Sequence, residues 1–185
     1  QGRRAVTKFA YFEGAIRPIE DAKVSVMTHA FNYGTGWFGG LRGYWNAEHE
    51  QLYVFRIRDH YLRFLDSGKI LMAQVEESVD DLIGVTVDLL RREGYRQDCY
   101  IRPLGYKADA MIGVRLHNLT DAVTIFATPF GRYVEAEEGA RVHVSSWRRI
   151  DDNAIPARAK IVGAYVNSAF AKTEAPMDAG DFRLM

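Results

Sequence analysis

The chain has 185 residues, of which 48% are hydrophobic and 26% are charged. This composition is that of an ordinary globular protein, and the length suits one domain or one domain and part of a second. Lys and Arg together number 24, as do Asp and Glu, so the formal net charge is zero. Nucleic acid and anionic membranes favour a basic excess in the proteins that bind them, so we expect neither as a partner.

Cys99 is the single cysteine of the sequence, so no disulfide can form within the chain. One free cysteine fits a reducing compartment, and we expect a cytoplasmic protein. No apolar run approaches the length that spans a membrane. The five histidines are scattered and lack the spacing of a metal motif, so no metal site is predicted.

The first 45 residues combine predicted strands with a glycine-rich stretch. Residues 9–17 (FAYFEGAIR) are typical of a hairpin that turns at Gly14, and residues 23–27 (KVSVM) alternate as a half-buried strand does. Residues 29–45 (HAFNYGTGWFGGLRGYW) alternate glycines with aromatic side chains. Two interpretations stay open for this stretch: a tightly packed loop, or the wall of a pocket for an apolar ligand.

Two helices are predicted in the middle of the chain. Asp59 is the expected N-cap of a helix over residues 60–73. A second helix is expected from Ser78 to Gly94, because an S-x-x-D capping box opens it and apolar residues then recur at helical spacing. Gly94 suits the end of this helix.

Strands are predicted on either side of these helices. Residues 52–56 (LYVFR) form a short strand before them, and residues 122–127 (AVTIFA) form a buried strand after them. Residues 99–106 (CYIRPLGY) form another strand, in which Pro103 favours a sheet edge or a bulge.

The rest of the chain is expected to begin a second domain. A small α+β domain is predicted over residues 1–127, and the polar residues 128–138 are its linker. Residues 139–185 then begin another unit, with a strand at 141–147 (RVHVSSW) and a helix at 166–175.

Two groups of side chains are candidates for chemistry. Tyr100 and Arg102 face the same side of their predicted strand, where a hydroxyl and a guanidinium can grip a carboxylate. An exposed cross-strand pair is the simpler interpretation. Lys160 stands among small and apolar residues, and burial there would favour the neutral amine that forms an imine with an aldehyde. A solvated surface lysine is the alternative.

Several motifs together resemble those of branched-chain aminotransferases, which are class-four aminotransferases of fold type IV among pyridoxal-phosphate enzymes. HAFNYGTGWFGGLRGY resembles the family signature H-A-x-x-Y-G-x-x-x-F-E-G-x-R-x-Y. FRIRDHYLRFLDSGKIL resembles F-R-x-x-E-H-x-x-R-L-x-x-S-A-K. YIRPLGY, VSSWRR and PARAKIVGAYVNSAFAKTEA follow in the family's order and spacing. The resemblance extends over residues 11–180.

This resemblance implies a fold and a cofactor. It implies a small α/β sandwich domain, a linker that lines the active site, and a barrel-like domain that binds pyridoxal 5'-phosphate. Lys160 matches the family's Schiff-base lysine, which also moves the proton between the substrate Cα and C4′ of the cofactor. Arg63 matches the arginine that binds the phosphate, and Tyr165 matches the tyrosine that bonds the phenolic oxygen.

The resemblance also implies substrates and a substrate pocket. The reaction is transamination between branched-chain L-amino acids (Leu, Ile, Val) and 2-oxoglutarate, in a homodimer or larger homo-oligomer. Tyr100 would bind the α-carboxylate, while Arg102 with Tyr33 and Tyr133 would bind the distal carboxylate of glutamate. Tyr33 would reach the site of a neighbouring subunit. The pocket residues implied are Tyr33, Phe38, Tyr100, Arg102, Phe130 and Tyr133, with Tyr165 beside them.

Departures from the family pattern leave alternatives open. Gly39 stands where the signature has glutamate, and Phe130 stands where tryptophan is usual. The alternatives are a D-amino-acid or (R)-amine transaminase, an aminodeoxychorismate lyase, or a non-catalytic truncated fragment. The family's glutamate that pairs with the pyridine nitrogen would follow beyond residue 185. We therefore expect a chain truncated at its C-terminus and poorly active when isolated.

Overall fold

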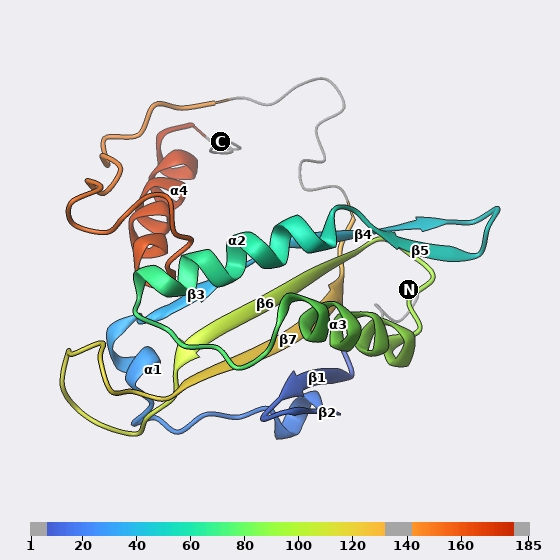
Figure 1. Cartoon of the computed structure of the whole chain (residues 1–185). Helices are drawn as coiled ribbons and strands as arrows, with labels where there is room; N and C mark the ends of the chain where they lie inside the picture. Colours follow the sequence, from blue (N-terminus) through green and yellow to red (C-terminus); the bar gives the residue numbers. More distant parts are fainter. Residues whose placement is uncertain (1–6, 132–141, 180–185) are drawn as a thin grey trace.

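The computed structural model describes residues 7–131 and 142–179. Figure 1 shows a twisted sheet with two long helices on one of its faces and a third helix at one end. The strands are β1 Phe9–Phe12, β2 Ala15–Pro18, β3 Gly36–Phe38, β4 Leu41–Asn46, β5 Gln51–Val54, β6 Cys99–Lys107 and β7 Asp121–Pro129. The helices are η1 Ile19–Asp21, α1 His29–Tyr33, α2 Ile57–Ile70, α3 Val79–Glu93, η2 Val162–Ala164 and α4 Tyr165–Ala179.

These strands form one antiparallel sheet in the order β2-β1-β7-β6-β4-β5, with β3 also paired to β6. The predicted hairpin is confirmed, because β1 and β2 are joined by Glu13 and Gly14, both with positive φ. Such a turn matches the twist of the strands it joins. The strands predicted at residues 52–56, 99–106 and 122–127 are confirmed as β5, β6 and β7 with shifted ends.

Helices α2 and α3 cover one face of the sheet and close the core over it (Figure 1). The indole of Trp37 is fully buried there beside Phe64 of α2, with the ring centroids 5.7 Å apart. Gly68 and Gly105 leave the space that this indole fills, since a Cβ would lie 2.8 Å and 2.2 Å from its atoms. Trp37 therefore locks β3 between α2 and β6.

Helix α3 has the predicted ends. The hydroxyl of Ser78 accepts from the backbone N–H of Asp81, and the Asp81 carboxylate accepts from the Ser78 N–H at 2.9 Å. Gly94 ends the helix in the left-handed conformation. Reciprocal bonds of this kind satisfy backbone N–H groups that lack a carbonyl partner at the start of a helix.

Helix α2 begins earlier than predicted, at Ile57 rather than His60. Its N-cap is Arg56 in the left-handed conformation, without a side-chain cap. Asp59 lies in the first turn and pairs with Arg56 at 2.6 Å. The prediction of Asp59 as N-cap was wrong, because the helix begins two residues before it. The Asp59 carboxylate instead pairs with Arg56 and lies in the first turn, where a negative charge stabilises a helix.

Two predicted strands are absent from the described residues. Residues 23–27 form no strand and pair with no strand of the sheet. Residues 142–147 also form none, and Arg141 lies outside the described residues. Val26 and Val144 are 76% and 93% exposed, so apolar alternation lacked a partner strand in both places.

Pro103 lies in a central strand, so the prediction of a sheet edge at this residue was wrong. Strand β6 pairs with β7 on one side and with β3 and β4 on the other. The Pro103 carbonyl accepts from Gly39 N at 2.9 Å, in the gap between β3 and β4. The missing N–H of Pro103 faces the same gap, where the ladder is already interrupted.

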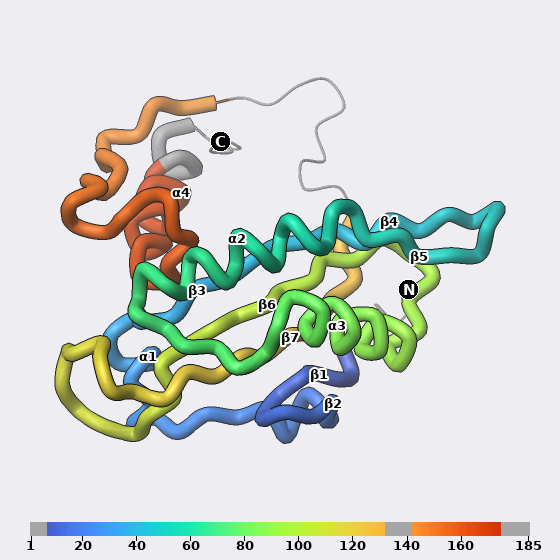
Figure 2. Tube along the Cα trace, viewed as in Figure 1, coloured from blue at the N-terminus to red at the C-terminus, as the bar shows by residue number. Residues whose placement is uncertain are grey.

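Residues 142–179 lie beside the α2 and β3 end of the sheet (Figure 2). The helix predicted at 166–175 is confirmed as α4, which is longer at both ends. The Glu174 carboxylate accepts from the backbone N–H of Ser146 at 3.1 Å and from the Ser145 hydroxyl. These bonds lower the pKa of Glu174 and tie α4 to the segment before it.

Candidate active site

The face of the sheet opposite α2 and α3 carries the predicted carboxylate-binding pair. Burial alternates along β6, so Tyr100 and Arg102 lie on this face while Ile101 points into the core. Arg102 Nε donates to the Tyr100 hydroxyl at 3.1 Å, and its guanidinium stacks on the Phe38 ring at 4.3 Å. The sequence prediction that Tyr100 and Arg102 share one side is confirmed.

Strand β3 brings Lys160 to the same face. Trp37 forms a bridge with Ile161, and Phe38 N donates to the Lys160 carbonyl at 3.0 Å. The Lys160 Nζ lies 4.8 Å from the centre of the Phe38 ring. Lys160 is half-buried rather than enclosed, so its amine stays accessible.

Tyr165 completes this group from the first residue of α4. The Lys160 Nζ donates to its hydroxyl at 2.5 Å, and its ring packs against Phe38 at 4.8 Å. The turn η2 between them is held by Gly163 N, which donates to the Gly34 carbonyl at 3.2 Å. A Cβ at Gly34 would lie 3.0 Å from Gly163, so two glycines allow this close contact.

The charge of this cluster is unbalanced. Within residues 7–131 and 142–179, neither Arg102 nor Lys160 forms an ion pair with a carboxylate. Both cations lie against the Phe38 ring. Aromatic faces attract cations, but only weakly compared with an anion in contact. The arrangement therefore suits a ligand that carries negative charge.

Arg63 lies on the exposed side of α2, one residue before Phe64, which packs against Trp37. Its Nη2 lies 3.3 Å from His60 Nδ1, and in the described residues it pairs with no carboxylate. Burial, and next the Arg63 charge, lower the pKa of His60. In the described part of the chain, no hydrogen bond joins Arg63 to Lys160.

Phe130 joins the cluster from the end of β7. Its ring lies 5.9 Å from the Tyr100 ring and 5.5 Å from the guanidinium of Arg42. Arg42 was not among the residues predicted from the sequence, because its proximity to Tyr100 depends on the pairing of β4 with β6. The arginine of the F-E-G-x-R-x-Y signature was the signal available for it.

Tyr33 lies outside the cluster, and Tyr133 lies outside the described residues. The Tyr33 hydroxyl accepts from Gly113 N at 3.0 Å, and its ring packs on His29 at 4.8 Å. The buried His29 donates from Nε2 to the Gly113 carbonyl at 2.6 Å. Tyr33 and His29 thus form hydrogen bonds with the backbone N–H and the carbonyl of Gly113.

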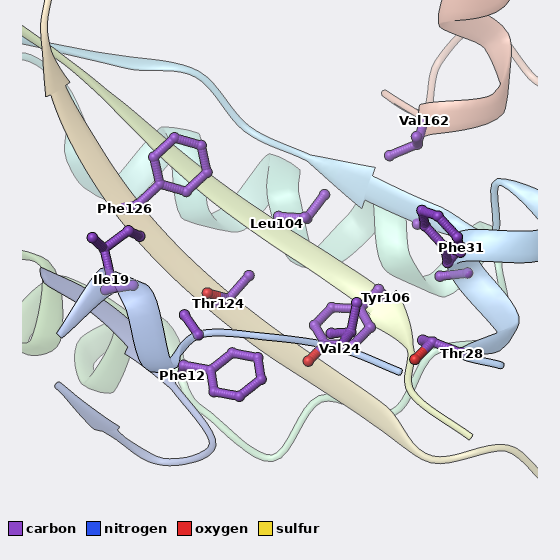
Figure 3. Close-up of a pocket in the computed structure, with 14 residues that line it drawn as sticks. Phe12, Ile19, Val24, Thr28, Phe31, Leu104, Tyr106, Thr124, Phe126 and Val162 are labelled. Atoms are coloured by element: carbon purple, nitrogen blue, oxygen red, sulfur yellow. The ribbon is translucent and has the colours of Figure 1, made fainter. Parts of the chain in front are cut away.

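An apolar hollow of about 380 Å³ lies on the same sheet face as Arg102. Figure 3 shows Leu104 and Tyr106 of β6, Phe126 of β7 and Val162 of η2 at this hollow. Phe126 pairs with Arg102 across the two strands, so the hollow adjoins the charged cluster. An apolar space beside a polar end is a common form of small-molecule site.

Residues 44–185 match the family model described as amino-transferase class IV. The chain belongs to the class IV aminotransferases. Its relatives include a probable branched-chain-amino-acid aminotransferase of Aquifex aeolicus, 47% identical over 94% of this chain and 56% of that protein. The branched-chain-amino-acid aminotransferase of Escherichia coli K12 is 39% identical over 90% of this chain and 54% of its own length. The family expected from the sequence is confirmed.

Solved class IV aminotransferases share the fold. A branched-chain aminotransferase of Thermoproteus uzoniensis, solved with norvaline, has a TM-score of 0.88 and 39% identity over 94% of this chain and 58% of its own. The T.th. branched-chain amino acid aminotransferase, solved with N-(5'-phosphopyridoxyl)-L-glutamate, has a TM-score of 0.86 and 38% identity over 95% and 57%. Fold type IV is confirmed, and the chain spans about half the length of the relatives it matches.

The departure at Gly39 has a structural counterpart in this class IV aminotransferase. A Cβ at Gly39 would lie 2.8 Å from Cγ of Pro103. Restoring the signature glutamate would therefore require Pro103 to shift. The glycine lets β3 and β4 meet β6 closely at the border of the Arg102 cluster.

Proposed function

We propose that the protein transfers the amino group of Leu, Ile and Val to 2-oxoglutarate with pyridoxal 5'-phosphate as cofactor. The observation that carries the proposal is the Lys160 amine, hydrogen-bonded to Tyr165 and placed beside Arg102 without a carboxylate partner in the described residues. The names of the relatives, and the phosphopyridoxyl-glutamate solved in one of them, support the choice of reaction and cofactor.

The described residues fit this cofactor. An aldehyde needs an accessible amine, and Lys160 is half-buried with its amine directed at a phenol. A phosphate needs a cation that is not already paired, and exposed Arg63 meets this condition in the described residues.

Bound pyridoxal phosphate would supply an aldehyde carbon for amines and a ring that takes up electrons released at the substrate Cα. Lys160 would hold the cofactor and then carry the proton between the substrate Cα and C4′. Tyr165 would orient the Lys160 amine and hydrogen-bond the phenolic oxygen. Arg63 would bind the phosphate by paired N–H donors.

We assign substrate binding to the remaining residues of the cluster. Phe38 and Phe130 would contact apolar side chains, because aromatic rings offer a large rigid surface. Tyr100 would bind the α-carboxylate, and Arg102 would bind the distal carboxylate of glutamate. Tyr133 would add a hydroxyl to Arg102. Tyr165 lies beside Phe38 at the cofactor end of this group.

We infer a homodimer or larger homo-oligomer as the active form. Tyr33 lies apart from the Lys160 cluster, which fits a role in the site of a second subunit. Large apolar side chains near α1 and in the loop that Tyr33 grips are strongly exposed, which favours their burial against another chain. They are Val24, Val26, Met27, Phe31, Ile112 and Val114.

Two further assignments go with this proposal. We place the domain linker at residues 128–138, between a first domain over residues 1–127 and a second that begins at residue 139. Among the described residues no helix is long and apolar enough to cross a bilayer. The one cysteine is buried and unpaired, so the cytoplasm is the compartment we propose.

A donor panel tests the reaction. The full-length protein is loaded with pyridoxal phosphate, each donor is added alone, and the cofactor absorption is followed before and after 2-oxoglutarate is supplied. We expect L-Leu, L-Ile and L-Val to bleach the band and 2-oxoglutarate to restore it. D-Ala and an (R)-amine should leave the band unchanged. A response to D-Ala or the (R)-amine alone would contradict the proposal, because it would indicate the opposite substrate handedness.

A further inference from the structure

Arg42 lies at the point where β4, β6 and the end of β7 meet. It pairs with Tyr100 in the ladder between β4 and β6, so it lies on the same sheet face as the Lys160 cluster. Its side chain is 25% exposed. A long cation held this closely on a sheet face loses much side-chain entropy, so its contacts must stabilise it.

The guanidinium of Arg42 contacts four groups. Its Nη1 donates to the Gly131 carbonyl at 2.9 Å, and its Nη2 lies 3.5 Å from an Asp98 carboxylate oxygen. Its Cζ lies 5.5 Å from the centre of the Phe130 ring and 5.7 Å from that of Tyr44. Only a planar group with several N–H donors can meet an acceptor, a carboxylate and two ring faces together.

Asp98 fixes both sides of this contact. One of its carboxylate oxygens accepts from Trp45 N of β4 at 2.9 Å. Its backbone carbonyl accepts from Phe130 N at 3.1 Å. Arg42 and Asp98 thus join the first residues after β7 to β4, which lies beyond β6 in the sheet.

The contact continues into the candidate site through Phe130. The Phe130 ring packs against Tyr100, and the Tyr100 hydroxyl accepts from Arg102 Nε at 3.1 Å. A displaced Phe130 would remove this packing from the Tyr100 ring. Small displacements of this kind weaken binding strongly in pre-organised sites.

We propose that Arg42 is a positioning residue that fixes Phe130 and Gly131 and thereby sets the wall of the substrate pocket at Tyr100. The part that concerns substrate rests on the proposed transamination. The part that concerns Phe130 and Gly131 does not, since it depends only on contacts within the chain. Arg42 itself touches neither substrate nor cofactor in this proposal.

Hydrogen exchange of the protein, read by mass spectrometry on the peptide that holds the Phe130 and Gly131 amides, tests the first part. The variants are Arg42→Lys, which keeps the charge but cannot bridge, and Asp98→Asn, which weakens the hold on Arg42. Arg96→Lys is the matched control, because Arg96 also pairs with an acid, Glu50, and lies 5.5 Å from the Trp45 ring without touching Phe130.

We expect Arg42→Lys to raise exchange at these amides about tenfold, the effect of one lost charge-assisted hydrogen bond. Asp98→Asn should give a smaller rise, and Arg96→Lys should match the unaltered protein. Hydrogen exchange at the backbone amides in the middle of β6 should stay unchanged in all three variants. That result would show that the variants are folded. Equal exchange at Phe130 in Arg42→Lys and Arg96→Lys would overturn the proposal.

Steady-state kinetics with L-Leu and 2-oxoglutarate tests the second part. We expect Arg42→Lys to raise KM roughly tenfold while kcat stays within about twofold, because the pocket wall is loosened and the Lys160 chemistry is not touched. An equal fall in kcat with unchanged KM would overturn the positioning role. Absence of turnover in the unaltered full-length protein would instead contradict the proposed transamination, and the exchange result would still decide the role of Arg42.

Discussion

Gly40 leaves the space that the Tyr100 hydroxyl occupies. A Cβ at this position would lie 2.5 Å from that oxygen and 3.1 Å from two ring carbons. The atoms it would meet are the far end of a side chain, so the ring can yield by rotating. The absence of a side chain at Gly40 therefore positions Tyr100 at Arg102.

Gly40→Ala should leave the protein folded but move Tyr100 off Arg102. We expect a loss of about 0.5–1.5 kcal/mol in the free energy of unfolding, the cost of an off-rotamer ring, and a roughly tenfold higher KM for 2-oxoglutarate. Denaturant unfolding and steady-state kinetics measure the two effects. In a Tyr100→Phe background the added methyl group should matter less. Additive effects of the two substitutions would show that Gly40 does not act through Tyr100.

Sequence patterns predicted some site residues and missed another. Tyr100 and Arg102 could be paired in advance because residues two apart in a strand share a face. Lys160 and Tyr165 depended on the family motif, since apolar neighbours alone do not distinguish a reactive lysine from a packed one. Arg42 could not be assigned a role, because its contacts with Asp98 and Gly131 arise from strands that are distant in sequence.

At the scale of elements, the space left by Gly68 and Gly105, which we call the Trp37 slot, holds strand β3 in place, because the Trp37 indole fills it. The indole fills the space above Gly105 and beside Gly68, while the backbone of the next residue donates to the Lys160 carbonyl. Packing on the helix-covered face of β3 is therefore joined directly to the position of Lys160 on the other face. Protein cores tolerate added volume poorly at such contacts.

Gly105→Ala should destabilise the protein, because its Cβ would lie 2.2 Å from the Trp37 ring. We expect a loss of about 1–3 kcal/mol in the free energy of unfolding, measured by denaturant titration. Gly84→Ala is the control, since a Cβ there meets nothing within 4 Å and should stabilise helix α3 by about 0.5–1 kcal/mol. Trp37→Phe should relieve part of the Gly105→Ala loss. Equal stability of Gly105→Ala and the unaltered protein would contradict the claim that Trp37 fills the space at Gly105.

Predicted elements succeeded where local chemistry is sufficient and failed where pairing decides. The capping box at Ser78 and the turn at Gly14 determine their structures within a few residues, and both were predicted correctly. Residues 23–27 alternate like a strand, yet they pair with no strand of the sheet and Val26 is exposed. Pro103 was assigned to an edge or a bulge, because the gap between β3 and β4 depends on the whole sheet and is not visible in the sequence.

At the scale of the whole molecule, the two faces of the sheet have different roles. One face is covered by α2 and α3 and supplies the core (Figure 1). The other carries Tyr100 and Arg102, receives Lys160 and Tyr165 from the segment after β7, and adjoins the apolar hollow. The α+β fold class could be predicted from the order of strands and helices in the sequence. Which residues lie on each face of the sheet could be assigned only from the pairing of β6 with its neighbours.

The central claim is that Lys160 holds pyridoxal phosphate, and borohydride trapping with peptide mapping tests it most directly. The protein is mixed with the cofactor, its visible spectrum is recorded, and the product is reduced and digested. We expect a yellow band that reduction removes, with the label on Lys160 and no band in Lys160→Arg. Label spread over exposed lysines such as Lys69 and Lys172, at equal levels in the variant, would contradict the account.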